Sequence, residues 1–60
     1  MSRKIEVGKT VVWYYGEEHL VIAIRPSDNL IVLQQLNNGD EFTVSFELFG
    51  EILKDENNSI

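Results

Sequence analysis

The residues that could do chemistry in this 60-residue chain are few, and most lie in one short stretch. His19 is the only histidine, and it directly follows the acidic pair Glu17 and Glu18. One imidazole and two adjacent carboxylates fall short of the ligands of a tetrahedral zinc site, and successive strand residues point to opposite faces. We therefore predict that His19 is a surface residue and that no metal is bound here.

Other signs of catalysis are weak. Gly8, Lys9 and Thr10 resemble the end of a phosphate-binding loop, but the earlier glycine is missing and the next residues predict a strand rather than a helix. The chain contains no cysteine, which excludes thiolate nucleophiles, thiolate metal ligands and disulfides. We expect no catalytic residues, no cofactor and no enzymatic activity.

The aromatic run Trp13, Tyr14, Tyr15 offers a different chemistry, that of binding. Residues alternate across a strand, so at least one large ring must lie opposite the core. If Val11, Trp13 and Tyr15 face outward, Trp13 and Tyr15 form an exposed platform of the residue types most enriched at interface hot spots. In the alternative, a small domain uses these rings as core. The sequence leaves both arrangements open.

The elements that must position these residues are strands. Runs of Val, Ile, Thr and aromatic residues bounded by turn formers predict strands at 9–15, 19–25, 30–36, 41–46 and 51–54. Asn38-Gly39 favours a type I′ hairpin turn, which needs positive φ at both central residues. Segment 46–50 is too short for a regular helix, and we expect one 3₁₀ turn that ends at Gly50.

These elements predict an all-β fold, a small five-stranded barrel that leaves no exposed edges. The alternation of the fourth strand predicts an inward face, and we expect the neighbouring apolar residues to join that core; the set is Phe42, Val44, Phe46, Leu48 and Phe49. We expect one domain over 1–60, with the barrel at about 6–54 and a frayed acidic tail at 55–60.

Short motifs resemble those of Tudor-like and KOW-like barrels. They are the first-strand entry Val7-Gly8-Lys9-Thr10-Val11, the second-strand run Val21-Ile22-Ala23-Ile24, and Val44 followed by Leu48. The resemblance covers about Glu6 to Leu53 and implies an SH3-like barrel. Tudor domains hold methylated side chains in an aromatic cage, and the turn before the fourth strand here has no aromatic residue. The resemblance therefore implies a fold but no ligand.

Charge limits the partners. Ten acidic and five basic residues give a net charge of −5, so binding to nucleic acid through counterion release is disfavoured and a basic protein partner is favoured. The apolar runs are shorter than the roughly 20 residues that cross a bilayer, and residues 3–8 do not form a secretory signal. We expect a cytoplasmic protein with no membrane contact.

We predict a non-enzymatic protein–protein interaction module. The expected binding residues are Trp13, Tyr14, Tyr15, Glu17 and Glu18. The size and charge also suit a small bacterial or phage regulator that acts on a larger protein. The alternative is a nucleic-acid-associated barrel that stacks bases on its exposed aromatic rings. The oligomeric state does not follow from the sequence.

Overall fold

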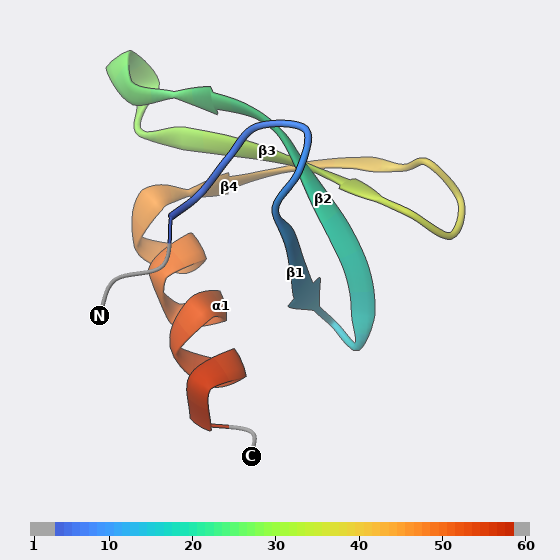
Figure 1. Ribbon diagram of the computed structural model, residues 1–60. Coiled ribbons are helices and arrows are strands. Elements are labelled where there is room, and N and C mark those ends of the chain that lie inside the picture. Colours follow the sequence, from blue (N-terminus) through green and yellow to red (C-terminus); the bar gives the residue numbers. More distant parts are fainter. Residues whose placement is uncertain (1–3, 59–60) are drawn as a thin grey trace.

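Four strands form one antiparallel sheet in the order β1-β2-β3-β4 (Figure 1). The computed structural model describes residues 4–58, and the side chains of residues 4–54. The strands are β1 (Val11–Tyr14), β2 (Glu17–Arg25), β3 (Leu30–Gln35) and β4 (Glu41–Ser45), with a short 3₁₀ helix η1 (Pro26–Asp28) between β2 and β3. Each strand pairs with the next, and β4 does not pair with β1, so the sheet is open.

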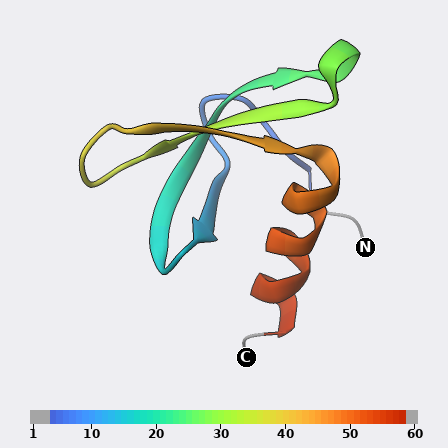
Figure 2. The same cartoon turned by 180° about the vertical axis from the view of Figure 1, so that it is seen from behind.

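Helix α1 (Phe46–Asn58) starts directly after β4 and covers one face of the sheet (Figures 1 and 2). Ser45 caps its first turn, because the Ser45 hydroxyl oxygen accepts a hydrogen bond from the Leu48 N–H at 3.1 Å. Phe49 and Ile52 lie three residues apart, on the same side of a helix, and both are buried. The helix thus forms because it is capped at its start and has an apolar face to bury.

The prediction of an all-β, five-stranded SH3-like barrel is wrong, because the protein has four strands and a C-terminal helix and is an α+β fold. Both the expected 3₁₀ turn at 46–50 and the expected strand at 51–54 lie within α1. Gly50 does not end the helix. Residues 55–58 of the predicted tail lie within α1, which continues to Asn58, and residues 59–60 lie outside the described residues.

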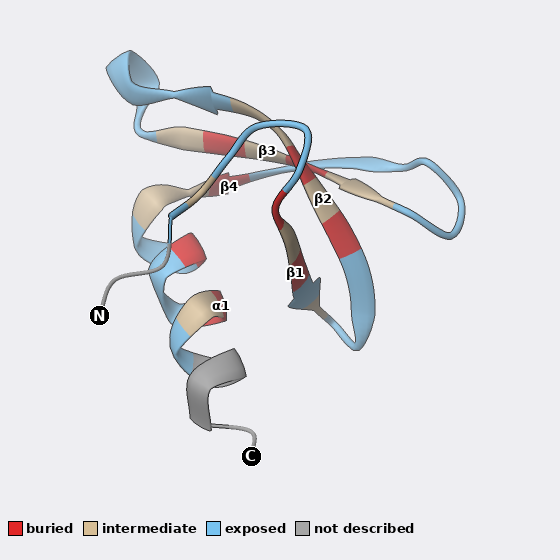
Figure 3. Ribbon diagram, viewed as in Figure 1, coloured by how far each residue is buried: buried red, intermediate tan, exposed pale blue. Residues whose placement is uncertain are grey.

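The core lies between the sheet and α1 (Figure 3). Its buried apolar residues are Val12, Val21, Ile31, Leu33, Val44, Phe49 and Ile52. The predictions for Val44 and Phe49 are confirmed, and Phe46 packs against this core while partly exposed. The predictions that Phe42 and Leu48 belong to the core are wrong, because 39% and 40% of their surface is exposed. Phe42 lies at the start of β4, next to the β3–β4 turn, and Leu48 lies away from the buried helix face.

A bulge in β2 changes which side chains face the core. Val21 pairs with Leu33 and Ala23 pairs with Val32, so Ile22 is an extra residue in β2. Beyond it, Ile24 pairs with the buried Ile31 and therefore shares the core face with Val21. The regular alternation of a strand, which would put Ile22 and Ile24 on one face, therefore does not hold across the bulge.

The tight turns also differ from those predicted. The predicted hairpin between β3 and β4 is confirmed, but Gly39 has a φ of 80° while Asn38 has no positive φ, so the turn is not type I′. Asn38 instead accepts a hydrogen bond from the Asp40 N–H through its side chain, at 2.9 Å. The type I′ turn lies between β1 and β2, where Tyr15 and Gly16 have φ values of 55° and 74°.

The helix in the described part of the chain is not long and apolar enough to cross a membrane.

Gly50, inside α1, tests whether the helix continues through that position, and Gly39, in the β3–β4 turn, serves as its control. A Cβ atom would meet nothing within 4 Å at Gly50 or at Gly39, but only Gly39 has a positive φ. We expect Gly50→Ala to raise the free energy of unfolding by about 0.5–1 kcal/mol, because alanine favours the helix interior. The matched variant Gly39→Ala should lower it by roughly 1 kcal/mol. Urea denaturation followed by circular dichroism measures both, and a destabilised Gly50→Ala variant would contradict a helix that continues through residue 50.

Candidate functional site

The hairpin of β1 and β2 carries two exposed aromatic rings. Trp13 is 55% exposed and Tyr15 is 88% exposed, whereas Val12 is completely buried on the opposite face of β1. Tyr14 lies on the same face as Val12 and packs against the core. Of the two arrangements that the sequence left open, the structure therefore has the one with Trp13 and Tyr15 outward.

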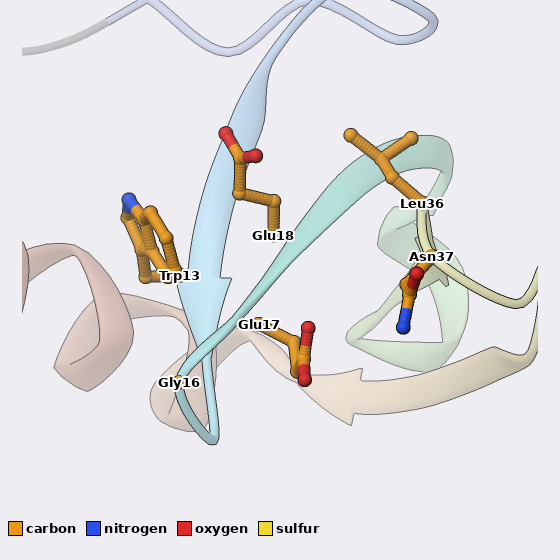
Figure 4. A pocket seen from close by; sticks show the side chains of 6 residues that line it. All are labelled: Trp13, Gly16, Glu17, Glu18, Leu36 and Asn37. Atoms are coloured by element: carbon orange, nitrogen blue, oxygen red, sulfur yellow. The ribbon is translucent and has the colours of Figure 1, made fainter.

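A shallow depression of about 430 Å³ lies beside Trp13 (Figure 4). We call it the hairpin groove, and it is lined by Trp13, Gly16, Glu17, Glu18, Leu36 and Asn37. Trp13 and Glu18 are opposite each other in the pairing of β1 with β2. The Leu36 N–H donates a hydrogen bond to the Glu18 carbonyl oxygen at 3.1 Å, which holds the β3–β4 turn next to β2.

The structure thus brings Trp13, Glu17 and Glu18 to one groove, as a binding site would require. Tyr14 is not among its lining residues, and Tyr15 lies at the turn beyond it. Sequence reasoning missed Leu36, which is 51% exposed and comes from a different hairpin. The only local signal was that Leu36 ends an apolar strand, which says nothing about its neighbours in space.

The hairpin groove combines apolar surface with negative charge. Glu17 and Glu18 are both exposed, and Figure 4 shows their side chains pointing away from each other. None of the described residues that line the groove is basic. A cationic side chain with an apolar stem fits such a surface, because its stem can lie on the indole ring while its charge faces the carboxylates.

The rings of Tyr14, His19 and Phe42 meet on the core side of the same hairpin, and the exposed Tyr15 ring at the turn contacts Tyr14; we call these four rings the ring cluster. The Tyr14 ring lies 4.5 Å from Tyr15, 5.5 Å from His19 and 6.5 Å from Phe42, measured between ring centroids. The His19 and Phe42 rings are 5.5 Å apart. The cluster closes the end of the core near the hairpin turn.

The prediction that His19 is a surface residue is wrong, because only 2% of it is exposed. Strand β2 starts at Glu17, which puts His19 opposite the buried Val12. Its Nδ1 atom lies 2.9 Å from the Glu17 carbonyl oxygen, within hydrogen-bonding distance. His19 therefore has a structural place in the ring cluster. Among the described side chains, those of residues 4–54, no group of three or more His, Asp or Glu is arranged to hold a metal ion.

A second depression, of about 360 Å³, lies on the sheet face opposite α1, and we call it the sheet depression. It spans β2, β3 and β4, and its lining residues are Ile22, Ala23, Arg25, Asp28, Leu30, Val32, Glu41 and Thr43. The bulge at Ile22 contributes to it, because Ile22 and Ala23 are consecutive and both line it. The sheet face away from the helix thus carries a shallow depression with a partly apolar lining.

No protein-family model, curated protein or solved structure matches this chain. A function can therefore be inferred only from the residues of the hairpin groove and their surroundings.

The surroundings of Tyr14 should be visible in its titration. Burial raises the pKa of the Tyr14 phenol above its usual value of 10.0, and the neighbouring Tyr15 raises it further through its charge and a side-chain hydrogen bond. We expect a late-titrating tyrosine in the absorbance change at 295 nm, and we expect Tyr14→Phe to remove it. Because the folded protein resists ionisation of Tyr14, its stability should fall above pH 10, and Tyr14→Phe should reduce that fall. An unchanged late component in Tyr14→Phe would contradict this assignment.

Tyr15 gives a way to remove a ring without damaging the turn. A bulky residue with a φ of 55° costs roughly 1–2 kcal/mol, whereas Asn-Gly is the preferred pair for a type I′ turn. We expect Tyr15→Asn to melt at or above the temperature of the wild type, as measured by calorimetry. A clear drop would mean that the contact between the Tyr14 and Tyr15 rings stabilises the turn by more than the strain costs.

Proposed function

We propose that this chain is a non-enzymatic protein–protein interaction module whose hairpin groove binds a basic surface of a partner protein. The observation that carries the proposal is the position of a half-exposed tryptophan next to Leu36 and two exposed glutamates. Tryptophan is among the residue types most often found as interface hot spots, and acidic rims steer basic partners toward a surface.

The distribution of charge supports a basic partner. The whole chain has a net charge of −5, and Glu17 and Glu18 add their negative charge at the apolar surface itself. A nucleic acid would meet this charge unfavourably, since its phosphates require basic side chains. A small regulator of a larger protein, of bacterial or phage origin, remains a specific form of the same proposal.

The groove also suits binding because a rigid scaffold holds it. Trp13 and Glu18 are opposite each other in neighbouring strands, and the backbone hydrogen bond between Leu36 and Glu18 holds the β3–β4 turn beside them. A preformed site loses little conformational entropy on binding, which favours affinity. Among the groove residues, Leu36 distinguishes the hairpin groove from a site built on the β1–β2 hairpin alone, because such a site would not contain Leu36.

Affinity capture from a lysate, followed by titration with the purified partner, tests the proposal. We expect Trp13→Ala to weaken binding about thirtyfold, because truncating a hot-spot aromatic residue costs 2 kcal/mol or more. Leu36→Ala should weaken the same complex, and both variants should stay folded because their side chains are half exposed. Wild-type affinity in both folded variants would place the binding surface elsewhere.

The charge requires its own control. Replacing both Glu17 and Glu18 by Gln should slow association and reduce its dependence on salt. Replacing Glu47 and Glu51 by Gln removes the same charge from exposed helix positions, and should have little effect. A captured nucleic acid, or equal effects of the two double variants, would contradict a basic protein partner in the hairpin groove.

A further inference from the structure

The outer edge of β4 has backbone groups that its neighbours do not use. Strand β4 pairs with β3 on one side, and among the described residues no strand pairs with its other side. Hydrogen-bonded pairs alternate with non-bonded pairs in an antiparallel sheet. The Gln35 N–H donates to the Asp40 carbonyl oxygen at 2.7 Å, and the Phe46 N–H donates to the Asn29 carbonyl oxygen at 3.0 Å. These two bonds set the alternation at both ends of β4.

It follows that Phe42 and Val44 direct their backbone groups toward β3, while Glu41 and Thr43 direct theirs outward. Across residues 4–58, no hydrogen bond engages the outward backbone groups of Glu41 or Thr43, and both residues are exposed. Strand β4 is at the edge of the sheet and leads directly into α1 (Figure 2).

The side chains along this edge have a definite chemistry. Asp40 and Glu41 are exposed acidic residues at the end of β4 near the hairpin turn. Glu41 and Thr43 border the sheet depression on one face, and Phe42, 39% exposed, lies on the other face. A strand added here would alternate its own side chains between an acidic, hydroxyl-lined face and an apolar face.

We propose that the outer edge of β4 binds an extended peptide in which basic and apolar residues alternate, and that this peptide adds a fifth strand to the sheet. Backbone hydrogen bonds to Glu41 and Thr43 supply affinity, and the alternating side chains supply specificity. The basic side chains lie beside Glu41, and the apolar ones lie beside Phe42. This site is separate from the hairpin groove.

Charge selects this occupant over a second copy of the chain. Short, charged edge strands discourage pairing with other sheets. A second copy carries a net charge of −5 and the same Asp40 and Glu41, so it meets like charge at this edge. A basic peptide meets opposite charge, and the acidic residues that repel a second copy attract it.

A short peptide of alternating lysine and valine is the probe. Amide hydrogen exchange, followed by NMR, should slow at least tenfold at Glu41 and Thr43 when the peptide is added. Exchange at Phe42 and Val44 should change little, because their N–H groups already bond to β3. This alternation distinguishes strand addition from binding through side chains alone.

Methylation of the peptide amides is the matched control. The proposed added strand is antiparallel to β4. Residues directly opposite each other in an antiparallel pair share a face and can exchange hydrogen bonds, so the lysines opposite Glu41 and Thr43 direct their own N–H groups toward β4. Methylating the lysine amides should weaken binding at least tenfold, whereas methylating the valine amides should leave it nearly unchanged. A peptide of alternating glutamate and valine should bind at least tenfold more weakly than the lysine peptide.

The two sites can be judged separately. Trp13→Ala should bind the lysine–valine peptide as the wild type does, whatever it does to a partner at the hairpin groove. Three results would overturn the proposal: no slowing at Glu41 and Thr43, equal binding of the two methylated peptides, or slow exchange that grows with protein concentration without peptide. The last result would assign the edge to a second copy of the chain.

Discussion

The structure depends on the packing of α1 against one face of an open sheet. The strands alone would leave Val12, Val21, Leu33 and their neighbours facing water, because the sheet does not close on itself. Phe49 and Ile52 complete this core from the helix. Each such side chain contributes roughly 1.5–3 kcal/mol when it is fully buried. In a small domain, where net stability is only a few kcal/mol, that contribution decides whether the sheet is ordered.

Because α1 covers one face of the sheet, a partner can reach only the other face, the edges and the turns. Trp13 lies on the opposite side of β1 from Val12, so burying the valine exposes the tryptophan. The hairpin groove and the sheet depression both lie where α1 does not cover the sheet. Stability and the proposed binding therefore draw on alternate residues of the same strands, and a substitution at one need not disturb the other.

Sequence reasoning found the features that local residues determine. Pro26 follows the end of β2 and Gly39 belongs to the β3–β4 turn. With such turn residues as boundaries, the first four predicted strands agree with the observed strands to within about two residues at each end. The misses depend on contacts distant in sequence. Ile52 fits a short strand as well as a helix until the sheet it covers is known, and the bulge at Ile22 has no local signal. The lining of the candidate groove was predicted in part, since Trp13 and the glutamates are close in sequence while Leu36 joins them only through the fold.

The strand order also determines how the chain can fold. Every strand pairs with its neighbour in sequence, so the three hairpins form through short loops, and such local topology favours rapid folding. The contact of α1 with β1 is different, because it joins the two ends of the described chain and closes a long loop. We therefore expect the hairpins to dominate the transition state and the helix to dock after it. Changes in the apolar face of α1 would then act mainly on the rate of unfolding, and so on the lifetime of the native state.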